Sequence, residues 1–286
     1  MSTSATTSRA ASRVTNCAAL LTLLGTFSAC DTLEGARGSD SLLAAFSPPT
    51  PTEAATWATN PYNPDLRYRG TLLLANATFG GEPVYVELYE DHIDDPDSNV
   101  RAAAARGLAN HGDPDHVNQI LTRLGDDDEF VRREAARALQ RLHNPIAVDD
   151  LLIASREPDL ERPDVPAEAD PEVRARAADA LGQYAESRVV EALIGSLADR
   201  SLAVNLSTRR ALSTLTGQDF AFDRRDWLDW YDSVDDPFAA RRPYTYPVFQ
   251  RDKKFVEYLP FVPGPPNEPE STPGGLPPVQ AFGTEG

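Results

Sequence analysis

The sequence predicts an all-α protein, a right-handed α-solenoid of about five helical hairpins with disordered segments at both ends. The main observation is a pattern that recurs at fixed offsets: a Val-Arg pair, an Ala-Ala pair, and then a small residue followed by Leu. It begins at Val100, Val131 and Val173, and a weaker copy begins at Val204. The successive valines are 31, 42 and 31 residues apart. A period near 30 residues with two helical patterns per unit is typical of hairpins that stack side by side.

An atypical first unit is expected at residues 61–93. Residues 63–76 align with residues 97–110, which places Arg67 at the position of Arg101. Terminal units of solenoids usually depart from the common pattern, because one of their faces has no neighbouring unit. We therefore expect the repeat domain to begin here.

Each later unit starts with an acidic cluster, whose carboxylates can cap free N–H groups at the positive end of the first helix. Apolar residues then recur at helical spacing, and Pro114 and Pro145 are placed to start two of the second helices. The spacing of 42 contains an 11-residue insertion within residues 156–168, where three prolines and five acidic residues exclude regular structure. A closing helix over residues 224–234 would complete the repeat domain, residues 61–234.

The composition limits which partners and which disulfide bonds we expect. The 286 residues include 44 acidic and 27 basic ones, so the formal net charge is −17. Such a surface repels phosphates, and we expect no nucleic acid partner. The two cysteines are Cys17 and Cys30.

Residues 1–29 resemble a bacterial lipoprotein signal peptide. An apolar stretch, too short to span a bilayer, ends in Phe-Ser-Ala immediately before Cys30. The resemblance implies cleavage before Cys30 and lipidation of its thiol, although Phe27 stands where Leu is usual. An ordinary secretory signal and a buried N-terminal helix are the alternatives. Lipidation would anchor the protein to a membrane of the cell envelope, facing the periplasm or the exterior, and would leave no cysteine pair for a disulfide.

Three further segments differ in composition from the repeats. Residues 30–60 are rich in Ser, Thr, Ala, Pro and Gly and are expected to form a flexible tether. Residues 235–263 are aromatic and interrupted by prolines, which predicts an extended segment. Residues 264–286 have the composition of a disordered tail.

The repeated unit resembles the HEAT repeat, in the short bacterial form known from phycobilisome-lyase-type proteins. In that family an Asp and the Arg after Val form a ladder of hydrogen bonds between successive units. The resemblance implies a structural ladder that contains Asp95, Arg101, Asp126, Arg132, Arg174 and Asp199. We expect the pairs Asp95–Arg101, Asp126–Arg132 and Asp199–Asn205. We also expect a weaker ladder toward the C-terminus, where Glu168 replaces Asp and Asn205 replaces Arg.

No catalytic constellation is found in the sequence. Related enzymes with a di-iron centre use His-Glu pairs, which this chain lacks, and its four histidines lie near expected helix ends. We therefore predict no metal site, no cofactor and no catalytic residue. The acidic run at residues 126–129 lacks the alternating ligands and glycine of a calcium loop.

Four aromatic residues are candidate contacts for a protein partner: Trp227, Trp230, Tyr244 and Tyr246. For the two tryptophans the alternative is a lid over the core of the last unit. The strip that contains the two tyrosines either packs along the solenoid or docks onto another protein. We expect a lipid-anchored scaffold or adaptor that binds an unidentified protein. The alternative is a divergent enzyme with bilin-lyase-like or hydroxylase-like activity.

Overall fold

The computed structural model describes residues 49–248, 252–258 and 271–277. The chain divides into two units, Met1–Thr50 and Pro51–Gly286, and the helices described here belong to the second. The described residues form eleven α-helices and no strand, apart from one isolated bridge between Leu142 and Gly274. The prediction of an all-α solenoid is confirmed.

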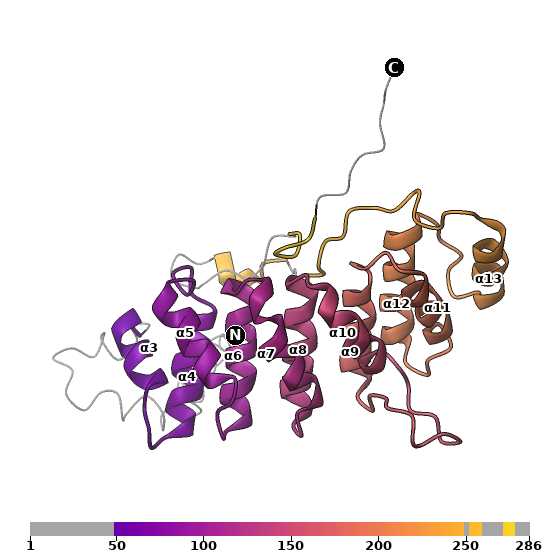
Figure 1. Ribbon diagram of the computed structural model, residues 1–286. Coiled ribbons are helices and arrows are strands. Elements are labelled where there is room, and N and C mark those ends of the chain that lie inside the picture. Colours follow the sequence, from indigo (N-terminus) through magenta and orange to yellow (C-terminus); the bar gives the residue numbers. More distant parts are fainter. Residues whose placement is uncertain (1–48, 249–251, 259–270, 278–286) are drawn as a thin grey trace, which may run out of the picture. The chain divides into compact units, whose positions relative to one another are not determined.

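The first helices of the hairpins form one row. In this row each helix packs against the next along its length (Figure 1). The members are α4 (Pro64–Ala75), α6 (Ser98–His111), α8 (Glu129–Arg141), α10 (Pro171–Leu181) and α12 (Leu202–Thr216). We call them the A helices.

The second helices of the hairpins, the B helices, are shorter. They are α5 (Pro83–His92), α7 (Val117–Thr122), α9 (Val148–Ala154), α11 (Ser187–Ser196) and α13 (Arg224–Ser233). A 3₁₀ turn leads into α7 (Pro114–His116) and another into α9 (Pro145–Ala147), so both prolines stand at the start of these segments as expected. A third 3₁₀ turn, Arg123–Gly125, follows α7.

Side-chain caps mark the starts of four of the A helices, which are α4, α6, α8 and α10. The carboxylates of Asp97, Asp128 and Asp170 accept hydrogen bonds from backbone N–H groups in the first turns of α6, α8 and α10. Asn63 does the same for α4. Each cap satisfies donors that have no partner within the helix, so the acidic clusters mark the true starts of the units.

The core lies between the two rows of helices. All four valines that mark the repeats are fully buried, as are the alanine pairs of α6, α8 and α10. Alanine allows neighbouring helix backbones to approach closely, because its side chain fills little of the space between them. The recurring pattern is therefore the set of contacts through which one unit covers the next.

Two segments differ from the expected organisation. Residues 51–58, expected within the flexible tether, form helix α3 (Pro51–Ala58), which packs against α4. There the backbone of Ala58 approaches Gly70 so closely that a Cβ on Gly70 would collide with it. Residues 271–277, expected within the disordered tail, hydrogen bond to the end of α8. The composition of these segments is typical of disorder, but contacts with the repeats compensate for the loss of chain entropy.

The expected signal peptide, Cys30 and most of the tether lie outside the described residues. Of the helices that the structure describes, none combines the length and the apolar character needed to cross a bilayer.

Candidate interaction surface

Four bidentate ion pairs connect the hairpins at the starts of the A helices. In each pair the guanidinium of one unit donates from Nε and Nη2 to the carboxylate that precedes the next A helix, at 2.7–3.1 Å. The pairs are Arg67–Asp95, Arg101–Asp126, Arg132–Glu168 and Arg174–Asp199. We call this row the ladder.

The pairing expected from the sequence was wrong in its register. Arg101 donates from Nη1 to the backbone carbonyl of Asp95, at 2.9 Å, and not to its carboxylate, which binds Arg67. Arg132 and Asp126 repeat this arrangement at 2.8 Å. The arginine six residues after the acid donates from Nη1 to the backbone carbonyl of that acid, in its own unit. Its Nε and Nη2 groups donate to the carboxylate of the next unit.

The expected weakening toward the C-terminus is not seen in the geometry. The longer Glu168 reaches Arg132 at 2.9 and 3.1 Å, and the Arg174–Asp199 pair is the most buried of the four. Asn205 retains the bond to the carbonyl of Asp199, at 3.1 Å. No further A helix follows α12 among the described residues, so there is no next unit for a ladder arginine to reach.

The ladder and the histidines have the character of structural groups. Burial alone would raise the pKa of Asp126, but hydrogen bonds from Arg101 and the N–H of Asp128 outweigh it and hold the pKa below its ordinary value. Burial lowers the pKa of His92, His111 and His143. In the described part of the chain, no group of three or more His, Cys, Asp or Glu side chains has the arrangement of a metal site.

The two candidate tryptophans belong to a closing aromatic cluster. Trp227 is fully buried, donates from Nε1 to the carbonyl of Ala221 at 3.2 Å, and contacts Phe220 and Trp230 edge-on. Trp230 is half-buried against the same core. Since Trp227 covers the open end of the last unit, it is not accessible to a partner, and its assignment as a candidate contact is corrected.

The candidate tyrosines lie in a segment that runs across the solenoid. We call residues 238–248 and 271–277 the C-terminal strap. It passes over the C-terminal ends of α12, α10 and α8 in that order, opposite to the order of the repeats (Figure 1). The N–H of Arg242 donates to the carbonyl of Thr214 at 2.7 Å, and its guanidinium donates to the carbonyl of Gly217. These bonds satisfy carbonyls that α12 leaves without partners.

Tyr244 is the buried anchor of the strap. Its hydroxyl donates to Asp179 of α10 at 3.1 Å, and this carboxylate also accepts from Gln140 at 3.2 Å and from Arg210 at 3.0 Å. Burial raises the pKa of Asp179 to about 6, against the opposing effects of the Arg210 charge and of the Tyr244 hydrogen bond. The carboxylate connects three repeats and the strap.

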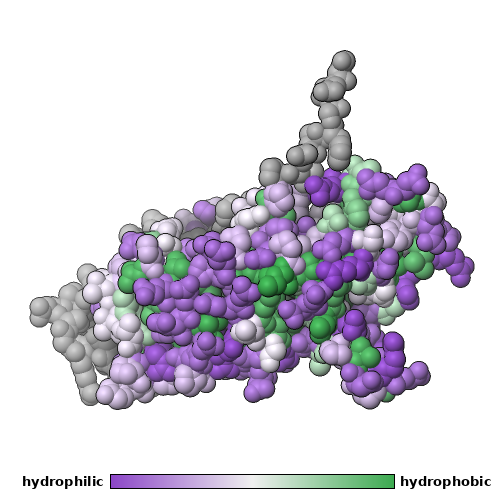
Figure 2. Space-filling view, in the orientation of Figure 1, coloured by the Kyte–Doolittle hydropathy of each residue, from purple (hydrophilic) through white to green (hydrophobic). Residues whose placement is uncertain are grey.

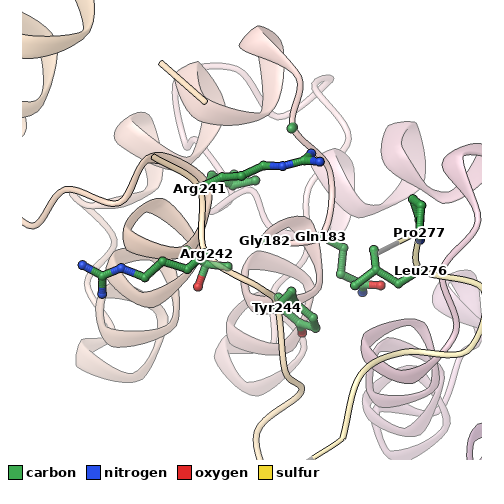
Figure 3. Close-up of a pocket in the computed structure, with 10 residues that line it drawn as sticks. Gly182, Gln183, Arg241, Arg242, Tyr244, Leu276 and Pro277 are labelled. Atoms are coloured by element: carbon green, nitrogen blue, oxygen red, sulfur yellow. The ribbon is translucent and has the colours of Figure 1, made fainter. Parts of the chain in front are cut away.

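A small cavity of about 40 Å³ lies beside this anchor. Figure 3 shows Tyr244 and Arg241 on one side of it and Leu276 and Pro277 on the other, with Gln183 between them. The two parts of the strap therefore border the same hollow over the turn after α10.

The strap makes its last contacts at the end of α8. The guanidinium of Arg141 lies over the ring of Tyr246, with its central carbon 4.6 Å from the ring centre. Gly274 exchanges backbone hydrogen bonds with Arg141 and His143, both at 2.8 Å. Gly275 has a φ of +80°, and a Cβ on it would collide with Pro114, so only glycine suits this close approach.

The B helices provide a second, more open face. Figure 2 shows apolar patches separated by hydrophilic surface on the side that it presents. Among the described residues, Val84, Ile146 and Ile153 are exposed apolar side chains of this row. Two clefts of about 680 and 350 Å³ border the insertion after α9.

Comparison with known families identifies the repeated unit. The family described as HEAT repeats matches residues 86–163, and the family described as PBS lyase HEAT-like repeat matches residues 173–199. These segments are HEAT repeats. The resemblance inferred from the Val-Arg and Ala-Ala pattern is confirmed, and α5 to α11 contain the matched repeats. A comparison with curated proteins gives no match.

Several solved structures are similar to the HEAT-repeat chain. The complex of CpcE and CpcF of phycocyanin lyase from Nostoc sp. PCC7120 is 24% identical, with 56% of this chain and 96% of that chain covered and a TM-score of 0.42. An engineered protein is 21% identical, with 57% and 78% covered and a TM-score of 0.42. A designed armadillo repeat protein is 15% identical, with 66% and 94% covered and a TM-score of 0.45. At these sequence identities and TM-scores, the similarities do not indicate what this chain binds.

The sequence contained a signal for the buried carboxylate that we did not use. Asp179 immediately precedes the Ala-Leu pair of its HEAT repeat, and the same position in the other copies is Arg106, Arg137 and Arg210. An acid at a position that is otherwise basic indicates a local contact that the other units lack. Here that contact includes Arg210 of the next repeat and Tyr244 of the strap.

Proposed function

We propose that this protein is a scaffold or adaptor that holds a partner protein against its HEAT repeats. The strap carries this proposal, because the ends of the A helices already bind a length of extended polypeptide through backbone carbonyls, a buried carboxylate and a guanidinium. Stacked repeats present such features at regular intervals on a rigid surface. The fold and the family matches are consistent with a protein-interaction scaffold.

We further propose that lipidated Cys30 anchors the scaffold to a membrane of the cell envelope. The support is the apolar stretch and the Phe-Ser-Ala-Cys sequence at its end. Fractionation of cells that express wild-type protein or Cys30→Ser tests the anchor. Wild type is expected in the membrane fraction and to label with a palmitate probe, whereas the variant loses both properties. Equal distribution of the two proteins between fractions would refute the anchor.

Crosslinking in native membranes, followed by purification of the full-length protein, tests the scaffold role. We expect one protein to be enriched in a stoichiometric amount. A partner that binds at the ends of the A helices should be lost from an Asp179→Ala variant and retained by Leu160→Ala, which alters an exposed side chain in the insertion. If the wild type captures no stoichiometric protein, the scaffold proposal fails. If both variants retain the partner, the partner binds elsewhere on the repeats.

The second candidate is a divergent enzyme of the bilin-lyase type or of the hydroxylase type, and the match of residues 173–199 to the PBS lyase HEAT-like repeat bears on the first type alone. An absorption spectrum and elemental analysis of the purified protein separate the two candidates. A bound chromophore or stoichiometric iron would support the enzyme.

A further inference from the structure

The surface beneath the strap has a spacing that suits an extended peptide. Arg242 contacts α12, Tyr244 contacts α10 and Tyr246 contacts α8, so every second residue contacts a new A helix. Two residues of extended chain advance about 6.5 Å, and packed helices lie about 8–10 Å apart. Long side chains directed along the row can cover the difference, whereas a helical segment would advance only about 3 Å over two residues.

The chemistry of this surface is specific for tyrosine at one of these positions and for an aromatic ring at another. The carboxylate of Asp179 accepts a hydrogen bond from the phenolic hydroxyl at the bottom of the site. Gln140 and Arg210 donate hydrogen bonds that hold the same carboxylate in place. One repeat further, Arg141 offers the flat face of its guanidinium to an aromatic ring. Arg141 is itself oriented by a hydrogen bond of 2.8 Å to Asn110. The side chains that hold the tyrosines are thus fixed by bonds within the repeats.

The site does not depend on the strap for its own structure. Arg210 and Gln140 both donate to Asp179 from A helices, so these bonds persist when Tyr244 leaves. The carboxylate then becomes accessible to water, which solvates its charge. An open state of the surface is therefore compatible with the folded repeats.

We propose that this surface is a docking site for an extended segment of the partner that carries a tyrosine and, two residues later, a second aromatic residue. This proposal rests on the scaffold function proposed above. Residues 242–246 of the strap occupy the site in cis and act as an internal competitor. A tethered segment has an effective concentration on the order of millimolar, so a partner segment must bind well to displace it.

Fluorescence anisotropy with a labelled peptide tests the proposal. The peptide has the sequence of residues 240–248, and the protein is the full chain, either wild type or a Tyr244→Ala, Tyr246→Ala variant that loosens the strap. We expect the loosened variant to bind the peptide at least about tenfold more tightly than wild type, because the internal competitor is removed. A peptide with phenylalanine at its first tyrosine position should bind about tenfold more weakly, because the bond to a charged acceptor is lost.

Two controls keep the result interpretable. Adding Asp179→Ala to the loosened variant should abolish the gain in affinity for the peptide. Adding Gly125→Ala should not change that affinity, because a Cβ on Gly125 meets no atom within 4 Å. If the loosened variant does not show the circular dichroism of wild type, the milder Tyr244→Phe full chain replaces it and should show a smaller gain. Equal binding by wild type and loosened variants, or binding that does not depend on Asp179, would overturn the proposal.

These outcomes separate this proposal from the scaffold function. If crosslinking identifies a partner but the peptide does not bind, the docking site is wrong and the scaffold role stands. If the peptide binds as expected but no partner is captured, the site stands and the scaffold role falls.

Discussion

At the scale of single residues, the arginine of each HEAT repeat holds two units together. Arg174 donates to the carbonyls of Glu168 and Ala169 in its own unit and to both oxygens of Asp199 in the next. Lysine cannot replace it, because a single ammonium group cannot bind a carboxylate through two parallel hydrogen bonds and also donate to the carbonyls on its other side. The side chains of this pair are almost fully buried, so removing one partner leaves a buried charge.

Asp199→Ala should therefore lower the free energy of unfolding by about 3–5 kcal/mol. Urea denaturation followed by circular dichroism measures the change. The control is Asp219→Ala, which breaks an exposed bidentate pair with Arg209 and should have a much smaller effect. Equal effects of the two substitutions would show that the ladder contributes no more than a surface ion pair.

At the scale of helices, the spacing between successive hairpins depends on small residues at particular positions. Gly107 of α6 faces the ring of the fully buried Tyr89 of α5, and a Cβ on Gly107 would lie only 2.6–2.7 Å from ring atoms. The equivalent position in α8 is Ala138, which is fully buried. Here the first hairpin contributes a large aromatic side chain from α5, and the second hairpin leaves room for it with a glycine in α6.

Gly107→Ala should destabilise the protein by about 1–3 kcal/mol, even though alanine has the higher helix propensity, because the buried tyrosine must move. Gly195→Ala in α11 is the matched control. A Cβ there meets nothing within 4 Å, so the change should stabilise the fold by up to about 1 kcal/mol. Thermal unfolding of both variants checks the sign, and stabilisation by Gly107→Ala would contradict the packing argument.

At the scale of the whole molecule, two electrostatic effects oppose each other in acid. The net charge of −17 favours expansion at neutral pH, and protonation relieves this repulsion. Hydrogen bonds and arginine charges hold the pKa of Asp95, Asp126 and Asp170 below the ordinary value, so their stabilising pairs are intact above about pH 4 and are lost below it. Burial lowers the pKa of three histidines, so their protonation also disfavours the fold below about pH 6.5. Asp179, with its pKa raised to about 6, acts in the opposite direction.

We expect the ladder and the histidines to prevail over charge repulsion, because their interactions are short and partly shielded from solvent. The melting temperature should fall gradually from pH 7 to about pH 4.5 and steeply below about pH 4. Asp126→Asn should show a smaller fall at the acidic end than wild type. A melting temperature that rises steadily as the pH is lowered would show that repulsion between carboxylates is the larger effect.

The sequence predicted most of the architecture and little of the interaction surface. The recurring valines and alanine pairs predicted the rows of helices, since each buried stripe follows directly from helical spacing. The ladder residues were named, but their pairing was wrong by one unit, because the reach of an arginine between units cannot be read from spacing within one unit. Tyr244 and Tyr246 were named as contacts, whereas Asp179, Arg141 and the two strap glycines were not.

By itself, the sequence determined that this chain forms stacked HEAT repeats, because the pattern of apolar residues is local and repeats in every unit. Only the tertiary structure decided that the strap lies on the ends of the A helices and that Tyr244 reaches a buried carboxylate. The contact between Tyr244 and Asp179 joins residues 65 positions apart, and it depends on how the helix ends line up in space. A pattern confined to one repeat contains no information about that alignment.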